Sequence, residues 1–209
     1  MADLESLLEK LAECDADNDH DGLRKVRETI VADYPQSEQS VEALYKIGLD
    51  NLFRQRKLDD AVEIFGVAAK RKHPYWSAAA RTSLGICLYH QGKKQKAIFE
   101  LRKVGNTEKP SEHSVTALAF IETIFLNEGN NDEVNRIRKE RINQLDTLIT
   151  KARENGDKSG LGQNLYNYGL ALVDSNDVEG ANKAFNEAKE MGPDILGADL
   201  YRALVDALK

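Results

Sequence analysis

The chain has 209 residues, of which 41% are hydrophobic and 31% are charged, so it can bury a core and is not a disordered chain. Its formal net charge of −6 argues against a general nucleic-acid binder, because affinity for a phosphate backbone grows with the number of Lys and Arg contacts. Cys14 and Cys87 lie far apart in sequence, which indicates buried thiols in a reducing compartment rather than a disulfide.

The beginning of the chain carries Asp3, Glu5 and Glu9 and has no basic leader, so we expect no secretion signal. The longest apolar run, residues 117–121, is much shorter than the roughly 20 residues that cross a bilayer. We therefore expect a cytoplasmic protein without membrane insertion.

Apolar residues recur with helical spacing along nearly the whole chain, and no segment has the alternation of a strand. Short polar connections separate the helices, which makes consecutive helices antiparallel neighbours. We predict an all-α fold of five helical hairpins and a C-terminal capping helix, in a single domain over residues 1–209. The hairpins should cover residues 3–35, 37–74, 76–110, 112–155 and 159–193, and the capping helix residues 194–209.

Two local features mark boundaries between these hairpins. Ser37 is well placed to cap the helix that follows it, because its hydroxyl can accept a hydrogen bond from an unpaired amide of the first turn. Residues 156–162 contain several glycines and Ser159, so this segment is the best candidate for a hinge.

A spaced set of small and aromatic residues recurs three times and indicates a helical repeat. The pattern is clearest near the C-terminus, and the earliest copy has one extra residue between its Gly and its Ala. We expect Gly and Ala to face each other across a hairpin, and the larger residue that follows to fill the gap to the next hairpin. The three copies are Gly169, Ala181, Phe185, Ala188 and Pro193; Gly85, Ala97, Leu101, Val104 and Pro110; and Gly48, Ala61, Phe65, Ala68 and Pro74.

These residues resemble the tetratricopeptide repeat (TPR) family. The first hairpin departs from the pattern at Leu23 and Arg27, and the fourth at Val134 and Arg138, where Ala and an aromatic or Leu are expected. The resemblance implies a right-handed superhelical solenoid. In such a solenoid the first helix of each hairpin lines a concave inner face that holds a peptide or a helix of a partner protein.

Placed by this register, the inner face is apolar and aromatic with few charges. It lacks the Lys, Asn and Arg clamp with which some members of the family hold chaperone tails, so we exclude that ligand. We predict a noncatalytic adaptor that binds a peptide or an amphipathic helix through aromatic anchors. The alternative is that part of this surface packs within the molecule. The predicted groove residues are Tyr45, Leu49, Leu52, Phe53, Thr82, Ile86, Tyr89, His90, Tyr166 and Leu170.

An acidic turn over residues 17–28 gives an alternative function. Asp17, Asp19, Asp21, Gly22 and Glu28 match the spacing of a calcium loop, which would make the protein a calcium-responsive sensor. Arg24 stands where such loops have an inward apolar residue after the Gly, and no second loop is present to pair with this one. The competing hypothesis is a polar turn in which an Asp caps the second helix.

One further pattern is a run of basic residues before two aromatics. The run 70–73 is basic and precedes Tyr75 and Trp76, an arrangement that can bind phosphates but is also typical of a helix C-terminus followed by packed aromatics. The sequence shows no phosphate-binding glycine loop, nucleophile elbow or paired carboxylates, so we expect no enzyme, no catalytic residue, no metal and no cofactor. A last alternative is a self-assembling protein whose terminal helix docks into the groove of another copy.

Overall fold

The computed structural model describes residues 3–208, and all regular secondary structure in that range is helical, which confirms the all-α prediction. The chain divides into two compact units, Met1–Val104 and Gly105–Lys209. The single domain over residues 1–209 and its continuous superhelix stay predictions. No helix within residues 3–208 is both long and apolar enough to span a bilayer.

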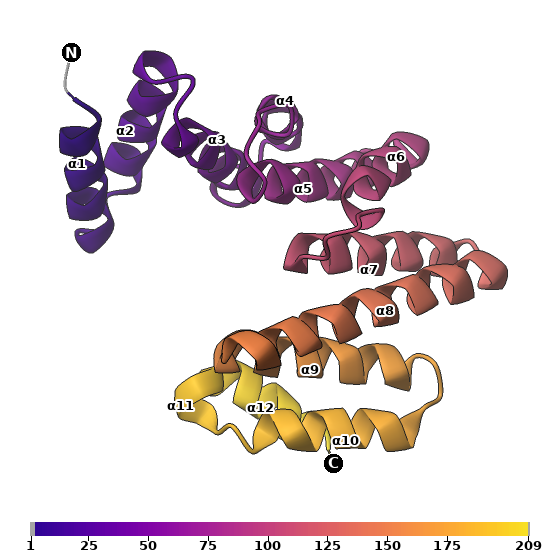
Figure 1. The fold of residues 1–209 in the computed structure, drawn as a ribbon. Coiled ribbons are helices and arrows are strands. Elements are labelled where there is room, and N and C mark those ends of the chain that lie inside the picture. Colours follow the sequence, from indigo (N-terminus) through magenta and orange to yellow (C-terminus); the bar gives the residue numbers. More distant parts are fainter. Residues whose placement is uncertain (1–2, 209) are drawn as a thin grey trace. The chain divides into compact units, whose positions relative to one another are not determined.

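The first unit consists of three helical hairpins (Figure 1). Within it, α2 packs on α3 and α4 packs on α5, so each hairpin is stacked on the next. Its elements are α1 (Leu4–Ala16) with α2 (His20–Asp33), α3 (Glu38–Leu49) with the π-helical turn η1 (Asp50–Arg54) and α4 (Leu58–Ala68), and α5 (Trp76–His90) with α6 (Lys94–Gly105).

The second unit contains two hairpins and a C-terminal cap. The cap is two helices rather than the single helix predicted over residues 194–209, because Gly197 adopts a φ of 77° and breaks the chain between them. Leu204 is fully buried against the last hairpin. The elements are α7 (Glu112–Asn127), α8 (Asn131–Asn155), α9 (Lys158–Val173), α10 (Val178–Lys189), α11 (Pro193–Leu196) and α12 (Ala198–Ala207).

The helix termini follow the expected capping chemistry. The Ser37 hydroxyl accepts a hydrogen bond from the Ser40 amide at 3.1 Å, as predicted. The predicted hinge over residues 156–162 is a tight turn instead. Gly156 ends α8 in the left-handed region, at a φ of 69°, and Asp157 directly caps α9.

One contact recurs between the two helices of a hairpin. A methyl group added to Gly48 would lie 2.5 Å from Phe65, and the matching distance from Gly169 to Phe185 is 2.3 Å. The distance from Gly85 to Leu101 is 2.5 Å. The large residue therefore packs onto the Gly of its own hairpin, which corrects the prediction that it reaches toward the next one. We call this contact the hairpin pair.

The extra residue in the earliest repeat copy forms a π-helical turn. The Gln55 amide donates to the Asp50 carbonyl oxygen at 3.0 Å, a bond one residue longer than that of an α-helix. The turn thus absorbs the insertion between Gly48 and Ala61 while the Gly48–Phe65 contact is kept.

The two cysteines are free and buried, as the sequence predicted. Burial raises the pKa of the Cys87 thiol to about 11, so this group stays protonated and unreactive at neutral pH.

Candidate functional site

Tyr45 and Tyr166, predicted as groove anchors, are half-buried packing residues. The Tyr45 ring centroid lies 5.9 Å from that of Phe65 and 5.5 Å from that of Trp76. Tyr166 repeats the first contact, with its centroid 5.9 Å from that of Phe185 and the same interplanar angle of 44°. Each Tyr stands one helical turn before the Gly of a hairpin pair, so its ring extends the core.

Thr82 is also withdrawn from the surface. It is 5% exposed, and its hydroxyl donates a hydrogen bond to the Ala78 carbonyl oxygen at 3.0 Å. Its placement in an accessible groove is therefore wrong. The other predicted positions stay predictions: Leu49, Leu52, Ile86 and Tyr89 are half-buried, and Phe53, His90 and Leu170 are exposed.

A cleft opens in the first unit, between α1 and α3 with α2 as its floor. We call it the N-terminal cleft. Its volume is about 360 Å³, within the range of small ligand sites, and it combines an apolar base with charged side chains. It is lined by Leu8, Leu11, Ala12, Asp15, Leu23, Arg27, Ile30, Gln39, Glu42, Ala43 and Lys46.

The N-terminal cleft lies where other hairpins have their hairpin pair. Leu11 and Arg27 have the spacing of Gly85 and Leu101, so Leu11 stands at the Gly position and Arg27 at the position of the large apolar residue. Leu11 is too large for the close helix contact that a Gly allows, and a charged Arg27 does not fill the space as Phe65 does. Both residues line the resulting cleft.

Arg27 is half-buried, and its side chain forms no hydrogen bond or ion pair within residues 3–208. The same holds for Glu42 on α3. Leu8 is 38% exposed at the rim. An unpaired cation beside apolar surface is costly to bury, and a carboxylate offers it the strongest hydrogen bonds.

The fourth hairpin has the same replacement together with a partner for its arginine. Glu122 stands at the Gly position and Arg138 at the aromatic position. Arg138 Nε lies 2.7 Å from Glu122 Oε1, and the carboxylate side chain is 3% exposed. Arg141 adds an ion pair to Glu122 at 3.2 Å and another to Asp174 at 3.0 Å. In the fourth hairpin the arginine is thus paired with a carboxylate of the same hairpin, whereas Arg27 in the first hairpin has no such partner.

The second unit has a smaller cleft of about 140 Å³ on the corresponding side, between α7 and α9. Leu170, one of the predicted groove residues, lines it and is 39% exposed. Thr116 also lines it and donates its hydroxyl hydrogen to the Glu112 carbonyl oxygen at 2.8 Å, so that its polar group is already satisfied. This cleft is consequently less polar than the N-terminal cleft.

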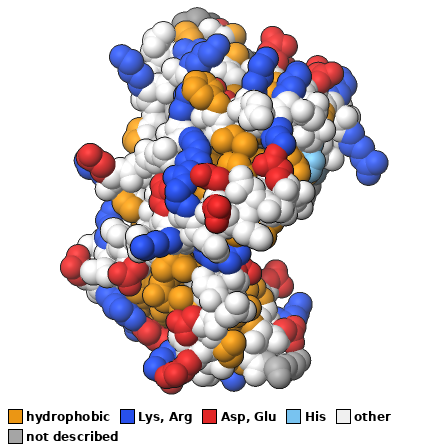
Figure 2. All heavy atoms as spheres, turned by 90° about the vertical axis from the view of Figure 1, so that its right-hand side faces the viewer, with side chains coloured by type: hydrophobic (Ala, Val, Ile, Leu, Met, Phe, Trp, Pro, Cys, Tyr) orange, Lys and Arg blue, Asp and Glu red, His pale blue; other side chains and the backbone are white. Residues whose placement is uncertain are grey.

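Exposed hydrophobic side chains are spread over both units. On the face shown in Figure 2 they emerge in small patches between charged side chains. Single exposed apolar residues are normal on soluble proteins, so the clefts rather than the patches define the candidate sites. The large exposed ones are Leu8, Phe53, Val67, Tyr75, Phe99, Leu126, Leu170, Val173 and Val178.

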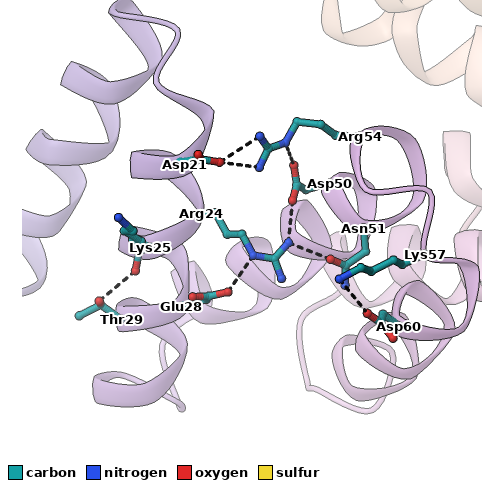
Figure 3. A network of polar contacts seen from close by, with 10 residues as sticks. All are labelled: Asp21, Arg24, Lys25, Glu28, Thr29, Asp50, Asn51, Arg54, Lys57 and Asp60. Atoms are coloured by element: carbon teal, nitrogen blue, oxygen red, sulfur yellow. Dashed lines mark hydrogen bonds and ion pairs between the residues drawn. The ribbon is translucent and has the colours of Figure 1, made fainter.

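The acidic turn does not have the geometry of a calcium loop. Helix α2 begins at His20, and Asp19 caps it by accepting a hydrogen bond from the Gly22 amide at 2.9 Å. Asp21 and Glu28 pair with Arg54 and Arg24 instead of converging (Figure 3). Within residues 3–208, no three His, Cys, Asp or Glu side chains are arranged to hold a metal. The capping hypothesis is therefore confirmed, and this arrangement gives no support to the calcium hypothesis.

The same arginines tie α2 to the π-helical turn through Asp50 (Figure 3). Arg24 Nη1 lies 2.7 Å from Asp50 Oδ2, and Arg54 Nε lies 2.5 Å from Asp50 Oδ1. Burial alone would raise the pKa of Asp50, but the hydrogen bonds from Arg54 and Arg24 outweigh it and lower the pKa below its ordinary value of 3.8.

We expect Asp50→Asn to lower the free energy of unfolding at about pH 7 by about 1–3 kcal/mol, the range for hydrogen bonds to charged groups. Because the pKa of Asp50 is lower in the folded state, its stabilisation is complete above the unfolded pKa and is lost as the pH falls through the folded value. Urea denaturation at several pH values should show a shallower acid loss for the variant. Equal pH slopes for both proteins would contradict this, and Asp21→Asn, at a site 78% exposed, is the matched control.

A solved structure shares the arrangement of these hairpins. The crystal structure of MamA, which is TPR-like, matches 85% of this chain and 91% of its own chain, with a TM-score of 0.50 and 19% sequence identity. No protein-family model matches the chain, and no curated protein matches it. The likeness shows a TPR-like fold.

The predicted groove residues lie on α3, η1, α5 and α9 and include none of the residues that α1 and α2 contribute to the N-terminal cleft. The signal was present, because Leu23 and Arg27 depart from the repeat pattern and both line the N-terminal cleft.

Proposed function

We propose that the protein is a noncatalytic interaction scaffold whose N-terminal cleft binds a short helical or extended segment of a partner protein. The observation that carries the proposal is the unpaired, half-buried Arg27 in a cleft with an apolar base. The TPR-like fold supports it, since stacked hairpins present clefts between successive first helices.

The Glu122–Arg138 pair indicates the chemistry of the bound segment. In the fourth hairpin an arginine at the aromatic position is satisfied by a carboxylate from the Gly position. In the first hairpin Leu11 occupies that position, and neither Asp15 nor Glu42 of the cleft pairs with Arg27, so we expect a partner to supply the carboxylate. The segment should thus present an Asp or Glu within one helical turn of apolar residues that cover Leu8 and Leu11.

We expect peptides selected from a displayed random library to carry such a carboxylate. Arg27→Glu should weaken their binding at least about tenfold, because truncating one member of a buried charge pair costs 2–5 kcal/mol or more. Leu8→Asp should have a similar effect, since it places a charge against the apolar base. Affinities are measured by fluorescence anisotropy with labelled peptides.

Val178→Asp is the matched control, because Val178 is an exposed apolar residue of α10 in the other unit. It should leave peptide affinity unchanged. Selected peptides without an acidic residue, or equal binding by wild type and Arg27→Glu, would refute the proposed site. Tyr45→Ala is unsuitable for this purpose, since it removes core contacts with Phe65 and Trp76.

The self-assembly alternative is not proposed in its predicted form. The terminal helix α12 packs against α10 of its own chain, and Leu204 is fully buried in that core. It is therefore not free to dock into another copy.

A further inference from the structure

The charges of the first unit are distributed unevenly along the sequence. Between Ala61 and Val104 the chain has nine Lys and Arg residues and only two carboxylates, Glu63 and Glu100, although the whole protein carries −6. The side chains of four of these lysines form no hydrogen bond or ion pair within residues 3–208. These are Lys70, Lys72, Lys93 and Lys96.

A groove of about 530 Å³ runs through this basic region, between α4 and α6 with α5 as its floor. We call it the basic groove. It is formed by other elements than the N-terminal cleft, because the second helices of two hairpins make its walls. Its lining consists of Val62, Glu63, Gly66, Val67, Ala69, Lys70, Arg81, Leu84, Glu100 and Lys103.

An ion-pair cluster lies in the basic groove, and its single carboxylate, Glu100, is paired with two cations. Arg81 Nη1 lies 2.5 Å from Glu100 Oε2, and Lys103 Nζ lies 2.8 Å from Glu100 Oε1. Arg81 also donates to the Ala69 carbonyl oxygen. Because Glu100 is neutralised by two cations, it offers little attraction to a basic ligand, and the cluster as a whole is positive.

Apolar groups lie beside these cations. Gly66 has no side chain, and a methyl group at its position would meet nothing within 4 Å, so the α4 wall is open there. Val67 next to it is 39% exposed. Phe99 is 61% exposed on α6, and Lys103 Nζ lies 4.0 Å from its ring centroid. The groove thus combines an apolar base, the exposed Val67 and two lysines, and Phe99 lies exposed beside Lys103 on α6.

We propose that the basic groove binds an acidic amphipathic helix of a partner protein. Charge complementarity sets the sign of the ligand, since Lys70 in the groove wall pairs with no carboxylate within residues 3–208 and the cluster of Arg81, Glu100 and Lys103 is positive. The apolar base and the exposed Val67 and Phe99 require a ligand with an apolar face, which a helix supplies at every third or fourth residue. A bare polyanion would satisfy the lysines and leave these apolar groups exposed to water.

The test uses two labelled synthetic peptides of about five helical turns, roughly 18 residues, with the same Leu positions. One has Glu at its polar positions and the other has Lys. We expect the Glu peptide to bind in anisotropy titrations, with an affinity that falls as salt is added, and the Lys peptide not to bind. Absence of binding by the Glu peptide would overturn the proposal.

Gly66→Leu tests the groove itself. It should fill the open space and weaken binding at least about tenfold, the change expected when a docking surface loses well over 1 kcal/mol of interaction. It should not lower the unfolding midpoint, because a Cβ at this position meets no atom within 4 Å and Leu favours a helix more than Gly does. Lys70→Glu should also weaken binding, whereas Lys25→Glu, at an exposed lysine of α2, should not.

Two further ligands separate this proposal from simple polyanion binding. If a single-stranded RNA oligonucleotide or phosphatidylglycerol vesicles bind more tightly than the Glu peptide, and Gly66→Leu does not weaken the Glu peptide, the proposal is overturned. Leu8→Asp should leave binding of the Glu peptide unchanged. The proposal for the basic groove and the proposal for the N-terminal cleft can therefore be refuted independently.

Discussion

Phe65→Ala should lower the free energy of unfolding by about 3–5 kcal/mol, the usual cost of removing a fully buried aromatic side chain. Phe65 is 0% exposed and packs directly on Gly48, where no side chain can refill the space. The loss can be followed through Trp76, the single Trp of the chain, whose ring is linked to Phe65 through Tyr45. Urea denaturation monitored by Trp fluorescence gives the value.

The control is Phe53→Ala, which removes the same side chain from a position 73% exposed in the π-helical turn. It should change the free energy of unfolding by less than about 0.5 kcal/mol. Gly48→Ala on its own should destabilise by about 1–3 kcal/mol through overpacking. Combined with Phe65→Ala it should cost less than the sum, since the new methyl enters the vacated space. Additive effects in this double-mutant cycle would show that Gly48 and Phe65 do not form a pair.

The fold was largely predictable because a hairpin is a local structure. Helical periodicity and short polar connections placed the helices of both units, and Ser37 was recognised as a cap from its type and position alone. The extra residue between Gly48 and Ala61 was visible in the sequence, whereas its form as a π-helical turn was not. An insertion of one residue shows only that the connection between the two helices is longer. The geometry of the turn also involves the ion pairs of Asp50 with Arg24 and Arg54, which the sequence does not reveal.

The candidate site was less predictable, because exposure depends on contacts between helices. The register placed Tyr45 and Tyr166 on the inner face, and their rings turn onto Phe65 and Phe185 because each stands a turn before the small residue of its hairpin. The acidic turn shows the same limit. The spacing of Asp19 from the other acidic residues fits a calcium loop, but its side chain caps helix α2. Spacing alone does not distinguish a calcium loop from a helix cap.

In the fourth hairpin an ion pair between Glu122 and Arg138 takes the place of the hairpin pair, and its loss should have a large effect on stability. Glu122→Leu should lower the free energy of unfolding by about 3–5 kcal/mol, since breaking a buried pair leaves uncompensated charge. Arg138 and Arg141, whose side chains are 13% and 12% exposed, would lose their buried carboxylate and keep only their contacts with Asp174. Urea denaturation followed by circular dichroism measures the loss. Glu133→Gln, which breaks the exposed pair with Arg136, should cost less than about 1 kcal/mol.

A double variant tests whether the two forms of the hairpin pair are equivalent. Glu122→Gly with Arg138→Phe rebuilds in the fourth hairpin the pair that Gly169 and Phe185 form in the fifth. Buried ion pairs can often be replaced by well-packed apolar residues without loss, so the double variant should recover at least about half of the destabilisation of Glu122→Leu. If instead the two substitutions destabilise additively, the ion pair has a structural role that packing cannot replace. Recovery would mean that an apolar pair can replace the buried ion pair of the fourth hairpin, so that the charge of Arg138 is not itself needed for folding.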